Sequence, residues 1–157
     1  MKFVRHLGVG LAVALVGIQI VPVERENPPV TRDIGAPPAV DAVLRRSCYD
    51  CHSNETVWPW YSRVAPLSWL VSHDVVEGRE TLSFSTWDRY DAEARAELRA
   101  ETWEEVEEGE MPPWIYTPTH PEARLDAADR AVLRDWVRGL GALTHADAEA
   151  GEARGTH

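Results

Sequence analysis

The chain of 157 residues is poor in several residue types that proteins often use at functional sites. Cys48 and Cys51 are its only cysteines, Lys2 is its only lysine, and Met111 is its only methionine after the initiator. A zinc site needs more cysteine or histidine close by than this cysteine pair supplies. Acidic residues outnumber basic ones by 26 to 16, and the net charge of -10 argues against binding to nucleic-acid phosphates.

Both cysteines lie in one five-residue motif, Cys48-Tyr49-Asp50-Cys51-His52. The Cys-x-x-Cys-His spacing is typical of c-type haem attachment, in which two thiols add to the vinyl groups of one haem. The histidine that follows the second cysteine then lies where it can bind the iron. A thiol redox pair is the alternative, but it normally lies in a βαβ context that the surrounding sequence does not offer. We therefore expect one covalently attached haem c, held by Cys48 and Cys51, with His52 as an iron ligand.

Residues 1–23 are predicted to be a membrane anchor or a signal segment. Lys2 and Arg5 precede an apolar run from Leu7 to Val23. The run is long for the apolar part of a signal peptide, and no good small-x-small cleavage site follows it, which favours an uncleaved anchor over a cleaved signal. The positive N-terminus predicts that the rest of the chain lies on the periplasmic (extracytoplasmic) side of the cytoplasmic membrane.

Composition divides the rest of the chain into three parts. Residues 24–37 are rich in proline, and we expect an extended linker that separates the domain from the bilayer. Residues 38–141 carry helical patterns, which predict a small all-α domain. Residues 142–157 are small, polar and charged, and we expect a disordered tail.

The predicted domain has four helices, each with a recognisable start. Proline suits the first turn of a helix, and aspartate caps a helix by accepting a hydrogen bond from a backbone amide. The expected starts are Pro38, Pro66, Asp91 and Asp126. We expect the first helix to run into Cys48, the second to end near Gly78 and the third to end at Gly109.

The segment Trp58-Pro59-Trp60-Tyr61-Ser62-Arg63 combines aromatic side chains with an arginine. Because Pro59 and the aromatic density disfavour a helix, we expect a loop. In one interpretation the loop covers a haem edge, and Trp60 and Arg63 donate hydrogen bonds to the haem propionates. The alternative is a hydrophobic loop with a surface arginine, and the sequence favours neither.

A candidate sixth ligand lies in the segment Gly109-Glu110-Met111-Pro112-Pro113-Trp114. Two prolines restrict the backbone directly after Met111, so the thioether can be held on a rigid loop, and its sulfur is a soft donor that suits haem iron. His73 and His120 are the alternative ligands, and an open sixth position is a further alternative.

Together these motifs resemble a family of membrane-anchored haem-binding domain proteins from bacteria and, less closely, small class I c-type cytochromes. The resemblance covers about residues 20–140 and rests on Cys48 to Thr56, Trp58 to Ser62, Ala65-Pro66, Ser68-Trp69, His73-Asp74, Gly78-Arg79 and Gly109 to Pro113. It implies a class I cytochrome c-like fold in which Trp136 packs near the first helix of the domain. It also implies thioether links at Cys48 and Cys51, with His52 proximal and Met111 distal. Familiar soluble cytochromes meet partners through a ring of lysines, which this chain does not have.

The combined interpretation is a single-haem electron carrier tethered to the membrane, and not an enzyme. A haem ligated by histidine and methionine has no vacant position for a substrate, and methionine ligation raises the reduction potential. A peroxidase-like enzyme is one alternative, for which His73 or His120 could serve as acid or base. A haem-based ligand sensor or binding module is another. The expected partners are the membrane and redox proteins of unknown identity, with no nucleic acid.

Overall fold

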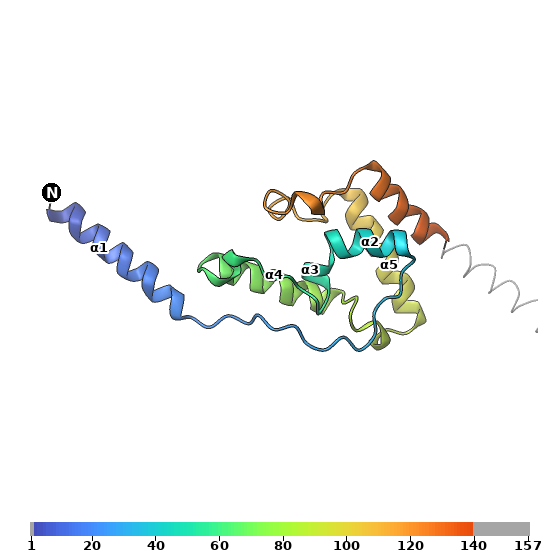
Figure 1. Cartoon of the computed structure of the whole chain (residues 1–157), viewed down its shortest axis with the longest axis horizontal. Helices are drawn as coiled ribbons and strands as arrows, with labels where there is room; N and C mark the ends of the chain where they lie inside the picture. Colours follow the sequence, from blue (N-terminus) through green and yellow to red (C-terminus); the bar gives the residue numbers. More distant parts are fainter. Residues whose placement is uncertain (1, 140–157) are drawn as a thin grey trace, which may run out of the picture.

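The structure, a computed structural model, describes residues 2–139. Across that range the chain is built from α-helices and short 3-10 turns, and its only strand-like feature is an isolated bridge between Arg32 and Thr86. One N-terminal helix stands apart from the group formed by the other helices (Figure 1). The predicted all-α class is therefore confirmed. The predicted disordered tail, residues 142–157, lies outside the described residues.

The N-terminal helix is long and apolar enough to cross a membrane. A signal sequence near the N-terminus can have the same length and composition. Helix α1 (Lys2–Gly17) continues into the 3-10 turn η1 (Ile18–Ile20), and the 19 residues from Lys2 to Ile20 contain no buried residue. At about 1.5 Å per residue this segment is roughly 28 Å long, close to the thickness of a bilayer's hydrocarbon core. Because none of its apolar side chains is buried by the chain itself, the helix needs another apolar environment.

Five further helices form the domain. They are α2 (Pro38–Ser47), α3 (Tyr49–His52), α4 (Leu67–Thr81), α5 (Ala92–Glu108) and a last helix over 127–139. Short 3-10 turns occur at η2 (Trp60–Arg63), η3 (Trp87–Arg89) and η4 (Pro121–Ala123). Helices α2 and α3 meet at the motif and lie between α4 on one side and α5 and the last helix on the other (Figure 1).

The predicted helix starts and stops depend on local chemistry, and most are confirmed. Pro38 opens α2, and the side chain of Asp91 caps α5 by accepting a hydrogen bond from the Ala94 amide at 2.9 Å. Gly109 ends α5 with φ at 83°, a left-handed conformation that costs glycine little. Helix α4 begins after Pro66 but runs to Thr81, about one turn beyond the expected end, because a glycine with ordinary helical geometry does not stop a helix.

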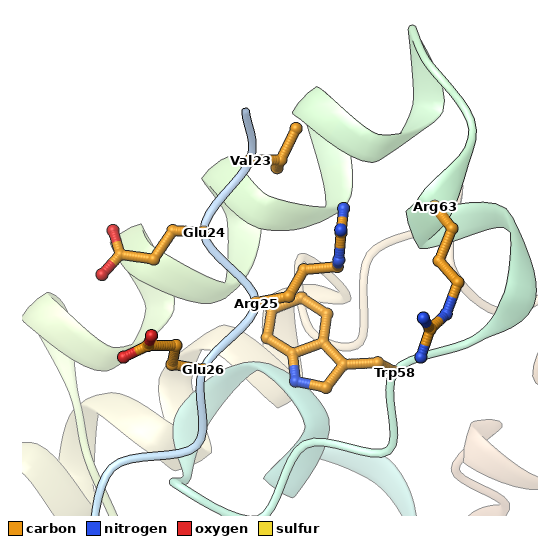
Figure 2. Close-up of a pocket in the computed structure, with 6 residues that line it drawn as sticks. All are labelled: Val23, Glu24, Arg25, Glu26, Trp58 and Arg63. Carbon is orange, nitrogen blue, oxygen red and sulfur yellow. The ribbon is translucent and has the colours of Figure 1, made fainter. Parts of the chain in front are cut away.

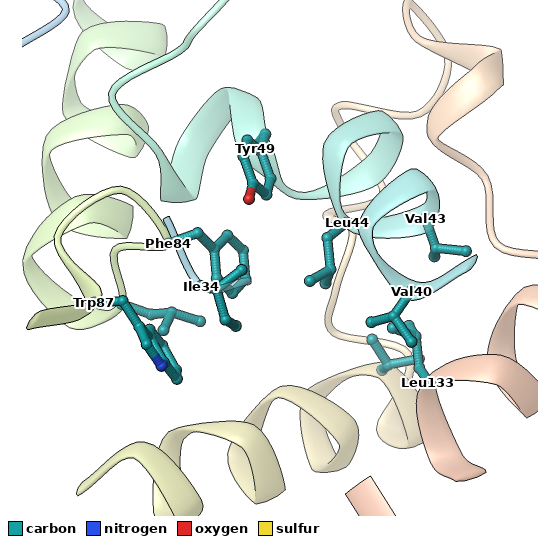
Figure 3. Close-up of a cluster of buried hydrophobic side chains, with 10 residues drawn as sticks. Ile34, Val40, Val43, Leu44, Tyr49, Phe84, Trp87 and Leu133 are labelled. Carbon is teal, nitrogen blue, oxygen red and sulfur yellow. The ribbon is translucent and has the colours of Figure 1, made fainter. Parts of the chain in front are cut away.

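Ten buried side chains form the core of the domain, and eight of them are labelled in Figure 3. Leu44 of α2 and Leu133 of the last helix are 0% and 1% exposed. Tyr49 of α3 stacks on Phe84 with ring centroids 5.3 Å apart. Trp136 packs against the edge of this cluster, to which α2 contributes. The first and last helices of the domain thus share one core with the helix that carries the motif.

The segment predicted as a spacer is extended, but it lies against the domain. The amides of Thr31 and Arg32 donate hydrogen bonds to the Ser85 carbonyl at 3.0 and 3.2 Å. Asn54 donates to the Pro29 carbonyl at 2.9 Å, and the side chain of Ile34 is buried in the core. An extended chain leaves its backbone polar groups free to pair, and here the domain supplies the partners.

Candidate haem-binding site

A single turn of backbone brings the two thiols and the imidazole of the motif together. Helix α2 ends at Ser47, and the φ and ψ of -128° and -31° at Cys48 break the helix before α3 begins. The amides of Cys51 and His52 donate back to the Cys48 carbonyl at 3.2 and 2.9 Å, which closes the turn. The local fold of the motif therefore matches the compact arrangement that its spacing predicts.

The imidazole of His52 is oriented by the end of helix α4. Its Nδ1 lies 3.0 Å from the Gly78 carbonyl oxygen and 3.2 Å from the Leu82 carbonyl oxygen. A carbonyl oxygen carries no proton, so Nδ1 must be the donor, and Nε2 then presents its lone pair. Burial lowers the pKa of His52 below its usual value, despite these carbonyl contacts, which favours the neutral imidazole. A neutral imidazole with its second nitrogen tied to a carbonyl is the usual form of a metal-binding histidine.

Helix α4 approaches the motif closely because it carries a glycine at the contact. A Cβ on Gly78 would lie 2.8 Å from the Cys51 carbonyl oxygen and 3.3 Å from the Cys51 Cβ. These distances leave no room for a side chain. The glycine thus lets the α4 backbone reach both the motif and the Nδ1 of His52.

The two thiols are free in the described structure and are not activated for redox exchange. Burial raises the pKa of Cys48 to about 12 and that of Cys51 to about 11, and the neighbouring negative groups add to both shifts. Catalytic thiols in redox pairs have lowered pKa values, because the thiolate is the nucleophile. The environment of this pair therefore argues against the thiol redox alternative.

Asp50, between the two cysteines, connects the motif to the loop that follows α5. The Tyr116 hydroxyl donates to Asp50 Oδ2 at 2.6 Å, and the Val57 amide donates to Asp50 Oδ1 at 2.8 Å. Burial raises the pKa of Tyr116, and the hydrogen bond to Asp50 raises it further, so the hydroxyl stays protonated and remains a donor. The pairing of Asp50 with Tyr116 could not be predicted from the sequence, because nothing local relates two positions so far apart.

Arg79 holds the segments that flank the motif. Its guanidinium donates to the Ser53 carbonyl at 2.7 Å, the Glu26 carbonyl at 2.8 Å, Asn27 Oδ1 at 2.9 Å and the Thr56 hydroxyl at 2.8 Å. One planar group thereby joins the extended segment before the domain to the residues just after His52. Its position next to Gly78 was part of the family resemblance, but its partners appear only in the fold.

The structure brings Met111 to the same core as the motif. Met111 and Cys48 both pack, partly buried, against the hydrophobic cluster. The Met111 amide donates to the Glu105 carbonyl at 3.1 Å, and the Glu105 carboxylate is close enough to His52 to act on its pKa. Met111 is thus fixed to the last turn of α5 at the edge of the core that Cys48 also contacts, and its role as a ligand stays a prediction.

The two alternative histidines lie in different surroundings. The His73 side chain is 70% exposed and its Nε2 is 3.4 Å from a carboxylate oxygen of Glu77. The His120 ring stacks on Tyr116 at a centroid distance of 3.9 Å, and it lines a small pocket of about 50 Å³ together with Cys51. His120 is thus the histidine that the fold places beside the motif.

Neither Trp60 nor Arg63 lines the small pocket beside Cys51. The Trp60 side chain is 76% exposed and meets the Tyr61 ring edge-on. Arg63 lines a larger pocket of about 410 Å³, whose other lining residues are Val23, Glu24, Arg25, Glu26 and Trp58 (Figure 2). Their contacts with haem propionates stay a prediction.

The residues of the motif fit haem in their donor chemistry. The site supplies two protonated thiols that are free to form thioethers, one neutral imidazole with an available Nε2, and a thioether on a neighbouring loop. A small all-α domain with this donor set defines the class of a haem-binding protein.

The chain belongs to the haem-binding domain family, whose pattern matches residues 13–139. Haem binding follows from that membership, and the predicted family is confirmed. No curated protein and no solved structure matches the chain.

Proposed function

We propose that this protein is a membrane-tethered, single-haem c-type electron carrier of the periplasmic face. The observation that carries the proposal is the hydrogen bond from His52 Nδ1 to the Gly78 carbonyl, 3.0 Å long, which leaves Nε2 as the only imidazole donor for iron. When bound, the haem supplies the one-electron chemistry. The protein supplies two thiols for attachment, oriented ligands and a site whose surroundings change little with oxidation state.

The chain's own residues support a rigid site. His52 is held by backbone carbonyls, which do not titrate, and it is flanked by Phe84 at a ring distance of 6.2 Å. Tyr116 and Asp50 hold the loop that carries Met111 against the motif. A carrier benefits from such constraints because small ligand movements lower the cost of reorganisation during electron transfer.

The proposed position of the haem domain depends on the N-terminal helix. If the segment Lys2–Ile20 stays in the membrane, the tether raises the effective concentration of the domain for membrane-bound redox partners. Lys2 and Arg5 at its start support a periplasmic position for the domain, by the positive-inside rule.

Two measurements test the proposal. The purified protein should keep its haem through denaturing electrophoresis, and Cys48→Ser or Cys51→Ser should each weaken that retention. The reduced protein should give a six-coordinate spectrum and a pyridine haemochrome typical of thioether-linked haem. Haem that is lost on denaturation would exclude covalent attachment, and rapid binding of carbon monoxide to the reduced form would favour a ligand-binding module over a carrier.

A further inference from the structure

The end of the N-terminal helix is attached to the domain by a pair of hydrogen bonds. The Ala65 amide donates to Gln19 Oε1 at 2.9 Å, and Gln19 Nε2 donates to the Ala65 carbonyl at 3.1 Å. A few residues later the Ser72 hydroxyl donates to the Glu24 carbonyl at 2.7 Å. The helix therefore ends against the loop between η2 and α4, and the extended segment that follows continues along α4.

This attachment sets the depth of the loop in a membrane. A helix from Lys2 to Ile20 has about the length of the hydrocarbon core, so Gln19 lies at its edge when the helix spans the bilayer. Ala65, paired with Gln19 through both of its backbone groups, must lie at the same level.

The residues around Ala65 expose apolar surface. Trp60 is 76% exposed, Val64 42%, Leu67 48% and Leu70 41%. All of them come from one short stretch that spans η2 and the first turns of α4. Single exposed apolar side chains are common on soluble proteins, but a group of this kind indicates an apolar partner.

Positive charge lies next to this apolar surface. Figure 2 shows the guanidinium groups of Arg25 and Arg63 on the same side of the extended segment, around the ring of Trp58. The side chains of Glu24 and Glu26 point away from them. Arginine and tryptophan are favoured at the level of lipid headgroups, where the charge meets phosphate and the indole has one wet side.

We propose that residues 60–70 form a membrane-contact face, which rests the haem domain on the bilayer surface in one orientation. The side chains of Val64, Leu67 and Leu70 enter the interface, and Arg25 and Arg63 meet lipid phosphates. Helix α5 then lies on the side of the domain away from the membrane, since it is at the opposite end from α1 (Figure 1). The inference rests on the membrane anchoring in the proposed function, but not on the electron-transfer role.

Lipid photo-crosslinking tests this orientation. Full-length, haem-loaded protein is reconstituted into phosphatidylcholine vesicles that contain phosphatidylglycerol and a photoactivatable phospholipid, and the crosslinked residues are mapped by mass spectrometry. We expect residues 60–70 to crosslink several-fold more than residues of α5. The double variant Val64→Ser/Leu67→Ser should lose most of that signal and keep the crosslinks of the N-terminal helix, whereas Glu101→Ser on α5 should change neither.

Two outcomes would contradict the proposal, and a third would separate it from the proposed function. Crosslinks confined to residues 2–20 would show that the domain stands off the bilayer, and this would overturn the membrane-contact face while leaving the anchor intact. Release of the protein from vesicles by alkaline carbonate would overturn both the anchor and this face. Crosslinks at residues 60–70 in a protein without a thioether-haem spectrum would support the face and contradict only the proposed function.

Discussion

The imidazole Nδ1 of His52 lies 3.0 Å from the carbonyl oxygen of Gly78, 26 residues further along the chain. The same glycine has no space for a Cβ, because the Cys51 carbonyl oxygen would be 2.8 Å away. One residue of α4 thus does two things, since its backbone orients the iron-binding imidazole and its lack of a side chain permits the contact.

Gly78→Ala should disturb the site more than an ordinary helix substitution. Alanine favours a helix over glycine, but here its Cβ forces α4 away from the motif, and we expect a loss of about 1–3 kcal/mol in unfolding free energy. The fraction of purified protein that carries haem should fall as well. Urea unfolding and the haem-to-protein absorbance ratio measure these effects. Glu80→Ala, exposed on the same helix, is the control, and equal behaviour of the two variants would refute the close-approach argument.

Met111→Ala and His120→Ala decide the sixth ligand. We expect the methionine variant to lose the weak far-red sulfur-to-iron absorption band and to lower the midpoint potential, because thioether ligation favours ferrous iron. His120→Ala should keep the band, since His120 is held in a stack on Tyr116. Optical spectra and redox titration of both variants provide the comparison. A spectrum that changes only in the His120 variant would assign ligation to the histidine.

Tyr116→Phe removes the hydroxyl that donates to Asp50 Oδ2 at 2.6 Å. A hydrogen bond to a charged acceptor contributes about 1.5 kcal/mol or more, so the variant's unfolding free energy should fall by that amount. Urea unfolding measures the loss as a lower midpoint concentration. Tyr61→Phe is a matched control, because the Tyr61 hydroxyl has only contacts of 3.4 to 3.5 Å. If both variants lose the same unfolding free energy, the hydrogen bond to Asp50 contributes no more stability than the weak contacts of Tyr61.

The pair of Arg46 and Asp129 joins α2 to the last helix at 2.6 Å and should make stability depend on acid pH. Burial alone would raise the pKa of Asp129, but the hydrogen bond and charge of Arg46, together with the hydrogen bonds between Asp129 and Asp126, outweigh it, and the pKa lies below its ordinary 3.8. A lowered folded-state pKa contributes stability above the unfolded value that disappears as the pH falls through the folded one. Arg46→Gln should therefore cost up to about 1 kcal/mol at pH 7 and nothing in strong acid. Urea unfolding measured from pH 7 down to strong acid tests this pH dependence, with Arg134→Gln as the control. If Arg46→Gln lowers the unfolding free energy equally at every pH, the pH dependence does not come from this pair.

Arg63→Gln separates two roles for this arginine. If Arg63 faces lipid phosphate, the variant should weaken crosslinking of residues 60–70 in vesicles with phosphatidylglycerol and leave the haem midpoint potential unchanged. If it binds a haem propionate, as in one interpretation of the sequence, the potential should shift and the crosslinks should stay. Arg124→Gln, at an exposed position, controls for the general loss of one positive charge.

Features that depend on neighbouring residues could be predicted from the sequence. The turn that joins Cys48 to His52, the Asp91 cap and the left-handed Gly109 each require only a few adjacent residues, and the structure has all three. The apolar N-terminal helix follows equally from composition. In contrast, the close packing of the extended segment 24–37 was not foreseen, because its partners Asn54 and Ser85 are distant in the chain.

Spacing, capping and apolar length are local properties, so the haem motif, the all-α domain and the apolar N-terminal helix follow from the order of the amino acids alone. The atoms that surround the motif are set by the tertiary fold. It selected Gly78 to orient His52, Tyr116 to bind Asp50, and Ala65 to receive the end of the N-terminal helix. These contacts join residues 26 to 66 positions apart, and they form only when packing of the core brings the helices together.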